Sequence, residues 1–240
     1  MIDLSSYGLE ESIGLHVILS NVMWWISLIL VIIAFRNRRI WNIGDAPWTF
    51  LFLAFFFFGI RELGHLSKEP LIGSIRYIFG IWSAIFMTTA LFFIFLILCH
   101  GRRITGVIIY IPYALALIFP VIWSYLYISD PGNLKSAMGA IENITWIIGS
   151  LVTIYTAYML GTRTTGDFVK VFMFFQFSAY LALTWKFLGL IETQGFTVSY
   201  SIREIIETLF GLFAIISMYI LTRMLRKLSK QLHGTYDNKS

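Results

Sequence analysis

Two short segments of this chain combine a basic residue, a carboxylate and a second metal-binding group at helical spacing. They read Ile60-Arg61-Glu62-Leu63-Gly64-His65 and Ile202-Arg203-Glu204-Ile205-Ile206-Glu207, and both follow the pattern Arg-Glu-x-x-His/Glu. Residues three positions apart lie on the same face of an α-helix. Each segment therefore places a carboxylate beside a second group that can bind a metal ion or join an ion-pair network.

Divalent metal binding is one chemistry that these segments could perform. If the two segments face each other, they offer one imidazole nitrogen and several carboxylate oxygens, which suit a divalent ion. The Glu-x-x-His spacing is similar to that of the di-iron carboxylate helix bundles. The candidate metal ligands are Glu62, His65, Glu204 and Glu207.

Other ionisable residues in the apolar stretches give two further interpretations. Such residues are costly inside a membrane and are functional candidates by default. The preferred interpretation is an ion-pair network in which basic residues neutralise the carboxylates, and the other is an anionic or zwitterionic ligand held by arginines. We predict one coupled site with Glu62, His65, Arg76, Arg203 and Glu207 at its core. The full set of candidate ligand-binding residues is Arg61, Glu62, His65, Arg76, Glu142, Lys186, Arg203, Glu204 and Glu207.

Seven apolar stretches must position these residues. Each is long enough to cross about 30 Å of hydrocarbon as a helix. The runs are nearly continuous over about 20 residues, whereas membrane-barrel strands are about 10 residues long and alternate strictly. The sequence therefore predicts an all-α integral membrane protein with seven transmembrane helices, near residues 14–35, 48–66, 73–99, 104–128, 138–160, 168–191 and 200–222.

The same stretches divide the chain into three parts. Residues 1–13 would form a short extracytoplasmic N-terminus, residues 14–222 the membrane domain and residues 223–240 a basic cytoplasmic tail. The first part carries Asp3, Glu10 and Glu11 and lacks a basic region. We therefore do not expect a cleaved signal peptide.

The composition supports a membrane environment. Hydrophobic residues make up 58% of the 240 residues and charged residues 13%, against roughly 45–50% and about 25% in soluble domains. Cys99 is the single cysteine, which excludes an intrachain disulfide framework and a cysteine-based zinc site. The basic residues are dispersed rather than gathered into one patch, so nucleic acid is not an expected partner.

The distribution of basic residues predicts the orientation. Alternate loops and the C-terminal segment hold twelve of the 18 Lys and Arg residues, and by the positive-inside rule that side is cytoplasmic. The N-terminus and the candidate site would then lie outside the cell membrane, which the chain crosses several times. The lipid bilayer is the main expected partner, with anionic lipids at the cytoplasmic face, and a second copy or a membrane partner subunit is left open. The basic residues on that side are Arg36, Arg38, Arg39, Arg102, Arg103, Arg163, Lys170, Arg223, Arg226, Lys227, Lys230 and Lys239.

A faint internal repeat relates the first three stretches to the last three. Gly44-Asp45 matches Gly166-Asp167, and Ser74-Ile75-Arg76 matches Ser201-Ile202-Arg203. The stretch at 104–128, with two prolines expected inside it, would be a kinked linker between the two halves. This arrangement of three, one and three helices with parallel repeats resembles the topology of SWEET and PQ-loop sugar transporters. No Pro-Gln pair occurs in the chain, so the resemblance transfers no functional residue.

Cofactor chemistry finds little support in the sequence. Microbial opsins bind retinal through a lysine in the last helix, but the stretch at 200–222 has none, and Lys186 lies in the preceding one. A haem bridge needs two histidines at similar depth, whereas His65 and His100 fall near opposite faces. Neither G-x-S-x-G nor H-E-x-x-H occurs, so we expect no hydrolase and name no catalytic residue.

These observations favour a protein that binds or transports a small solute or cation through an outward-facing cup of ionisable residues. Polar residues become sparse in the inner half, where Thr88, Thr89, Gln176 and Ser178 are the main candidates for a path, and this sparseness weakens conduction. One alternative is an accessory membrane subunit or a sensor or receptor-like module, since the pattern is also similar to the heptahelical sensor modules that precede some bacterial and archaeal kinases. A second alternative is a metal-dependent intramembrane enzyme.

Overall fold

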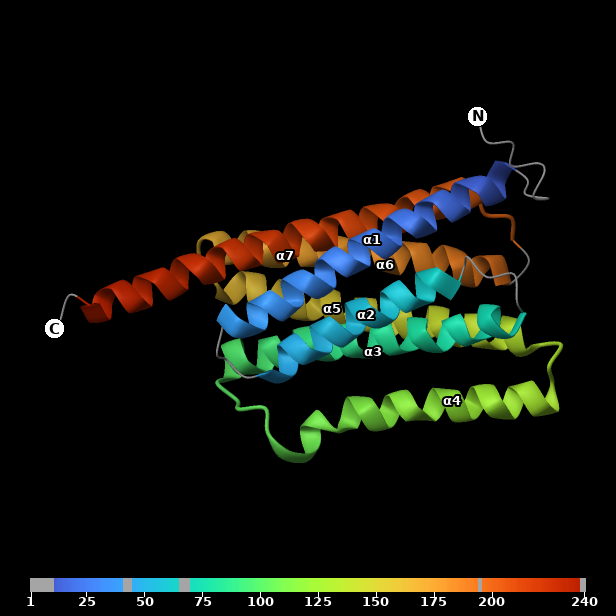
Figure 1. Cartoon of the computed structure of the whole chain (residues 1–240), viewed down its shortest axis with the longest axis horizontal. Helices are drawn as coiled ribbons and strands as arrows, with labels where there is room; N and C mark the ends of the chain where they lie inside the picture. The colour runs from blue at the N-terminus through green and yellow to red at the C-terminus, as the bar shows by residue number, and fades with distance from the viewer. Residues whose placement is uncertain (1–10, 41–44, 65–69, 194–195, 238–240) are drawn as a thin grey trace.

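The computed structural model describes residues 11–40, 45–64, 70–193 and 196–237. Within these ranges the chain folds into seven α-helices, so the prediction of an all-α fold is confirmed (Figure 1). A short 3₁₀ helix, Gly106–Ile109, precedes the fourth of them. The helices are α1 Glu11–Ile40, α2 Asp45–Gly64, α3 Pro70–His100, α4 Ile111–Ser129, α5 Leu134–Arg163, α6 Asp167–Thr193 and α7 Tyr200–Asp237.

Six helices in the described part of the chain, α2 to α7, are long and apolar enough to cross a membrane. They indicate a multi-pass membrane protein. The apolar segment of α1, Asn21–Asn37, is shorter, and the count of seven spans stays a prediction. Helix α7 ends at Asp237 and therefore runs through most of the expected basic tail.

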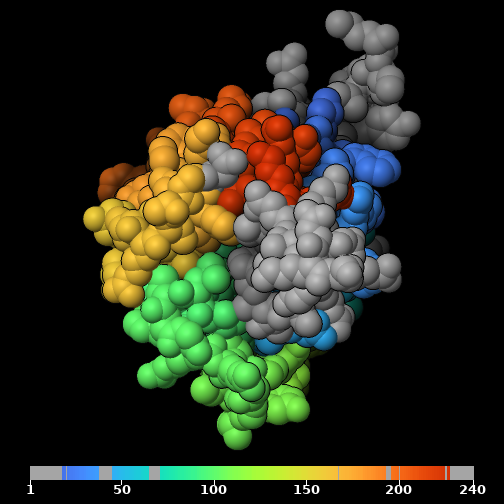
Figure 2. Space-filling model, turned by 90° about the vertical axis from the view of Figure 1, so that its left-hand side faces the viewer, coloured from blue at the N-terminus to red at the C-terminus, as the bar shows by residue number. Residues whose placement is uncertain are grey.

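Six of the helices form a closed ring. The order of packing is α1, α2, α3, α5, α6 and α7, and α7 packs back against α1. In the end view of Figure 2 the colours follow this order around the bundle, from blue through red, orange and yellow to green. The ring brings α2, α5, α6 and α7 together, although these helices are far apart in the sequence.

Helix α4 lies outside the ring, against α3 (Figure 1). Of its described residues, two are buried, Pro112 and Ala116. Pro120 has no N–H, so the carbonyl of Ala116 four residues earlier loses its helical partner. The indole Nε1 of Trp82 in α3 donates a hydrogen bond to that carbonyl at 2.8 Å. The proline therefore creates one of the acceptors through which α4 and α3 are joined; Trp123 of α4 also donates to Ser74 Oγ at 3.3 Å.

The start of α4 corrects one sequence expectation. The predicted stretch began at residue 104, but the helix begins at Ile111, after Gly106 with φ +72°. Pro112 consequently lies in the first turn of α4, where a proline is tolerated, and not in the helix interior. Of the two prolines expected inside the span, Pro120 is the one that the helix encloses.

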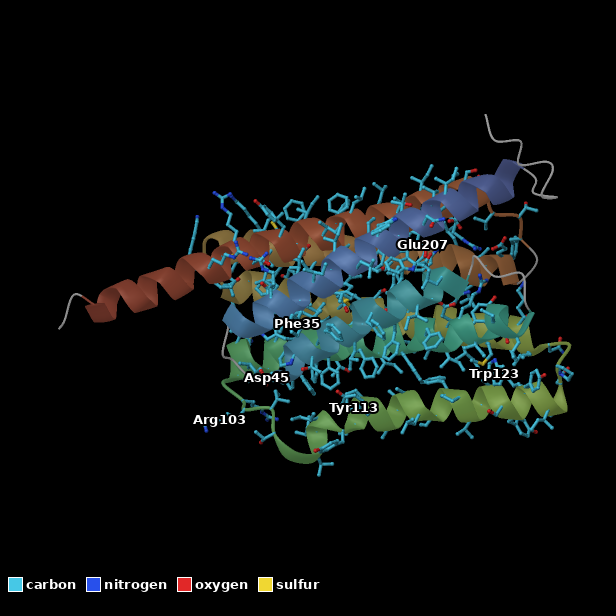
Figure 3. The ribbon with its side chains drawn as sticks, in the orientation of Figure 1. Phe35, Asp45, Arg103, Tyr113, Trp123 and Glu207 are labelled. Carbon is cyan, nitrogen blue, oxygen red and sulfur yellow. The ribbon has the colours of Figure 1, made fainter. Side chains whose placement is uncertain are left out.

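The two ends of the bundle differ in chemistry. Glu207 lies toward the end where α2 and α6 finish, whereas Asp45 and Arg103 lie at the opposite end (Figure 3). We call the first the glutamate end and the second the basic end.

Candidate functional site

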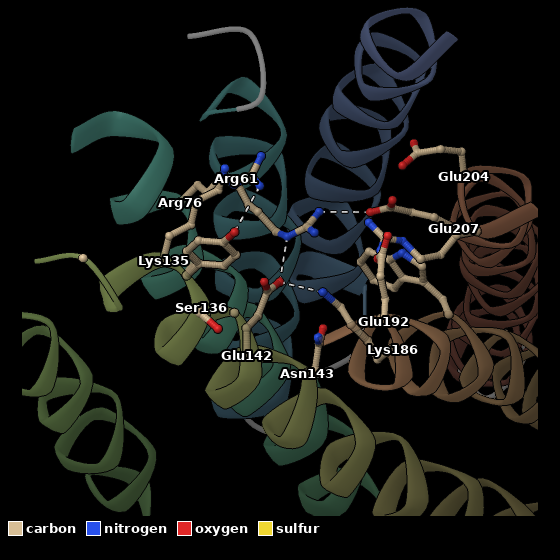
Figure 4. A pocket seen from close by; sticks show the side chains of 16 residues that line it. Arg61, Arg76, Lys135, Ser136, Glu142, Asn143, Lys186, Glu192, Glu204 and Glu207 are labelled. Atoms are coloured by element: carbon tan, nitrogen blue, oxygen red, sulfur yellow. Dashed lines mark hydrogen bonds and ion pairs between the residues drawn. The ribbon is translucent and has the colours of Figure 1, made fainter. Parts of the chain in front are cut away.

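Arg61 is the centre of a buried cluster of charges near the end of α2. Its Nε donates to Glu142 Oε1 of α5 at 2.7 Å, and its Nη1 donates to Glu207 Oε1 of α7 at 2.9 Å (Figure 4). The same Nη1 contacts the carboxylate of Glu62. One guanidinium therefore holds carboxylates from three helices together.

Lys186 of α6 adds a second cation to the cluster. Its Nζ donates to Glu142 Oε1 at 2.7 Å, so Glu142 is shared by two cations. We call Arg61, Glu62, Glu142, Lys186 and Glu207 the charge cluster; each of the five is at most 6% exposed. Removing several ionised groups from water is costly unless they are paired in good geometry, and this pairing requires all four helices in place.

Helix α3 places a glycine, Gly80, beside the charge cluster. A Cβ at Gly80 would lie 2.7 Å from Glu142 Cδ and 3.1 Å from Arg61 Cδ. The indole Nε1 of Trp146 donates to the carbonyl of Gly80 at 3.0 Å, which fixes α5 against α3 at this point. The missing side chain therefore provides the space in which Arg61 and Glu142 meet.

A cavity of about 440 Å³ lies on the side of the charge cluster that faces the glutamate end. Arg76 lies at its wall, with its guanidinium over the ring of Tyr77 at 5.0 Å. Arg203 contacts Glu192, whose side chain is 42% exposed. The ionisable side chains that line the cavity are Arg61, Arg76, Lys135, Glu142, Lys186, Glu192, Arg203, Glu204 and Glu207.

Four aromatic rings lie next to the charge cluster, on its side toward the basic end. Phe58, Trp146, Trp185 and Phe210 contact one another in every pairing, with centroids 5.7–6.4 Å apart. Lys186 Nζ lies 3.8 Å from the centroid of Trp185, a cation–π contact. We call these four rings the aromatic layer; Trp185 lines the 440 Å³ cavity, and the other three rings pack against Trp185.

A second, much smaller cavity of about 30 Å³ lies on the other side of the aromatic layer. Trp146 and Phe210 line it, together with aliphatic side chains. Four residues with hydroxyl groups are also part of its lining: Thr88, Ser150, Thr153 and Ser178. Thr88 and Ser178 are two of the residues that the sequence suggested for a polar path.

No known family model, curated protein or solved structure matches this chain. The chemistry of the site follows from its own residues. Cations and carboxylates face the same cavity, so a solute bound there would meet hydrogen-bond donors for an anionic group and acceptors for a cationic one.

The structure brings most of the predicted site residues to one place. Arg61, Glu62, Glu142, Lys186 and Glu207 form the charge cluster, and the cavity above it is also lined by the predicted residues Arg76, Arg203 and Glu204. The centre is Arg61, which the predicted core did not include. His65 lies outside the described residues.

The predicted metal site shares two carboxylates with the charge cluster. Glu62 and Glu207 both contact Arg61. In the part of the chain that the structure describes, no group of three or more His, Cys, Asp or Glu residues is arranged to hold a metal ion. Because His65 is outside that part, the four-residue metal site stays a prediction.

Proposed function

We propose that this protein is a membrane protein that binds a small zwitterionic solute in the 440 Å³ cavity. One observation carries the proposal: five ionisable side chains, each at most 6% exposed, face an open cavity instead of a closed core. The cavity volume falls within the 300–1,000 Å³ range of small-molecule sites. The five residues are Arg61, Glu142, Lys186, Glu204 and Glu207.

A purely structural role explains these charges less well. Buried ion pairs are often no more stabilising than apolar side chains of similar volume. A membrane bundle could therefore close this region with apolar side chains, as phenylalanine and tryptophan do at the aromatic layer. Charges kept beside a cavity favour a ligand that interacts with them.

The balance of charges favours a solute that carries both signs. The lining contains five cations and four carboxylates, so neither a purely anionic nor a purely cationic solute would match it. The arginines at the wall, Arg76 and Arg203, suit a carboxylate because their planar donors can bind two oxygens. Glu204 and Glu207 suit the ammonium group.

Binding can be tested on the purified protein with amino acids as zwitterionic probes. We expect some of them, at millimolar concentration, to raise the unfolding midpoint, because a ligand at 100 times its Kd stabilises by about 2.7 kcal/mol. Amines and carboxylates of matched size that carry one charge should stabilise less. Glu204→Gln should abolish the effect, and Arg163→Gln, an exposed residue at the basic end, should retain it. If no zwitterionic probe shifts the midpoint, the proposal fails.

Transport is a second candidate, favoured by the hydroxyl-lined cavity behind the aromatic layer. A solute that left the 440 Å³ cavity toward the basic end would have to pass these rings, so a transporter in this arrangement would be closed at the aromatic layer. Uptake of a stabilising probe into proteoliposomes would establish transport. Stabilisation without uptake would leave binding alone, as in a sensor or an accessory subunit.

The orientation is part of the proposal. The excess of Lys and Arg at the basic end supports a cytoplasmic position for this end. The 440 Å³ cavity, at the glutamate end, would then face the outside of the cell. The packing order supports the internal repeat, because α1, α2 and α3 occupy positions in the ring that correspond to those of α5, α6 and α7.

Cysteine labelling can test this orientation. In a Cys99→Ala background, Ser136→Cys at the mouth of the cavity should react with an impermeant thiol reagent added to intact cells. Arg103→Cys, exposed at the basic end, should react only in inside-out vesicles. Labelling of Arg103→Cys on intact cells would reverse the orientation.

A further inference from the structure

A second large cavity lies at the basic end, far from the charge cluster. Its volume is about 480 Å³, and it lies between α1 and α7. These two helices are the first and last of the chain, and their contact closes the ring. The cavity is lined by Ile33, Arg36, Tyr219, Thr222, Arg223, Arg226 and Lys227.

The residues of α7 in this lining follow a helical stripe. Tyr219, Thr222, Arg223, Arg226 and Lys227 are spaced as i, i+3, i+4, i+7 and i+8, which places them on one face of a helix. Helix α1 supplies Arg36 and Ile33 opposite this face. The stripe changes from an aromatic residue to basic residues along the helix.

The charge of this cavity differs from that of the 440 Å³ cavity. Four of its lining residues are basic, and among the described lining residues none is acidic. Arg36 and the three basic residues of α7 are exposed. A cluster of like charges at the surface attracts an anion, and phosphate matches the planar donors of arginine.

The position along the helices indicates where the anion belongs. Arg36 is the first basic residue after the apolar run of α1 and Arg223 is the first after that of α7. Both line this cavity, so they lie at the same boundary. Basic residues just beyond a membrane span lie at the level of the lipid headgroups. Tyr219, 62% exposed, lies one turn deeper, beside apolar surface that would face acyl chains.

We propose that this cavity binds the headgroup of an anionic phospholipid. The phosphate lies among Arg36, Arg223 and Arg226, and the acyl chains follow Ile33 and Tyr219 toward the apolar surface. A lipid bound in this way bridges α1 and α7 and stabilises the contact that closes the ring. The proposal is independent of any solute at the glutamate end.

The test compares phosphatidylglycerol with phosphatidylcholine, both added to the full chain in detergent micelles. We expect phosphatidylglycerol to raise the unfolding midpoint and to remain bound in native mass spectrometry, whereas phosphatidylcholine does neither. Arg223→Gln combined with Arg226→Gln should weaken phosphatidylglycerol binding by about tenfold or more. Arg36→Gln, a single change on α1, should also weaken phosphatidylglycerol binding. This variant replaces the double variant in the test if the double variant does not fold.

A matched control removes two charges from the same end outside the cavity. Arg102→Gln combined with Arg103→Gln, both exposed in the loop after α3, should change binding by less than about twofold, because distant surface charges are screened. Equal loss in this control would indicate a general electrostatic effect and overturn the site. Equal stabilisation by the two lipids would also overturn it. If inorganic phosphate stabilises as well as phosphatidylglycerol and displaces it, the cavity is a site for free phosphate and the lipid assignment is wrong.

Discussion

Arg61→Ala is expected to destabilise the folded protein by about 3–5 kcal/mol, the usual cost of removing one partner from a buried ion pair. The change removes the guanidinium that contacts Glu62, Glu142 and Glu207. Lys186 still contacts Glu142 in the variant, but the carboxylates of Glu62 and Glu207 lose a buried cation. Unfolding in detergent with increasing denaturant would measure the loss.

Arg203→Ala is the matched control for this prediction. Arg203 lines the same cavity, but its contact with Glu192 is partly exposed, and pairs of that kind contribute about 0–1 kcal/mol. Arg61→Lys should fall between the two variants, since lysine keeps the charge but cannot reproduce the planar set of donors. Equal losses for Arg61→Ala and Arg203→Ala would contradict the central role of Arg61.

Gly80→Ala is expected to be the other strongly destabilising change, by about 1–3 kcal/mol, the typical cost of overpacking a core. The added methyl group would overlap the carboxyl group of Glu142 and press on Arg61. Those side chains cannot move apart without lengthening the hydrogen bond between them. Thermal unfolding of the purified variant would measure the effect.

Gly73 provides a control in the same helix. A Cβ at Gly73 meets nothing within 4 Å, and alanine is favoured over glycine inside a helix by roughly 0.5–1 kcal/mol. Gly73→Ala should therefore be neutral or slightly stabilising. If both substitutions stabilise the protein, Gly80 is not needed for the contact between Arg61 and Glu142.

The sequence predicts the helices well because a long apolar segment inside a membrane can satisfy its backbone hydrogen bonds in few ways other than as an α-helix. Its error at the start of α4 has a local cause. Residues 104–110 are as apolar as a helix, but Gly106 adopts a positive φ and Pro112 starts a new helix. Hydropathy alone does not distinguish a membrane-spanning α-helix from an apolar connection that includes a short 3₁₀ helix.

The candidate site was only partly predictable. Charged residues stand out in apolar runs, so the members of the charge cluster were found, but their pairing depends on how the helices pack. The role of Gly80 could not be found because it requires the position of Glu142 on another helix. The aromatic layer left a weak signal: Phe58, Trp146 and Phe210 each lie three or four residues from Arg61, Glu142 and Glu207, respectively. A bulky ring one helical turn from each of these three charged residues is a pattern present in the sequence itself.

The cation–π contact between Lys186 and Trp185 gives the protein an optical reporter of its own. An ammonium group 3.8 Å from an indole ring perturbs the excited state of that ring. A solute that draws Lys186 toward its own carboxylate would change the emission of Trp185 without any added dye. The chain has eight tryptophans, so the difference in fluorescence between the native chain and a Trp185→Phe variant would report occupancy of the cavity that Trp185 lines.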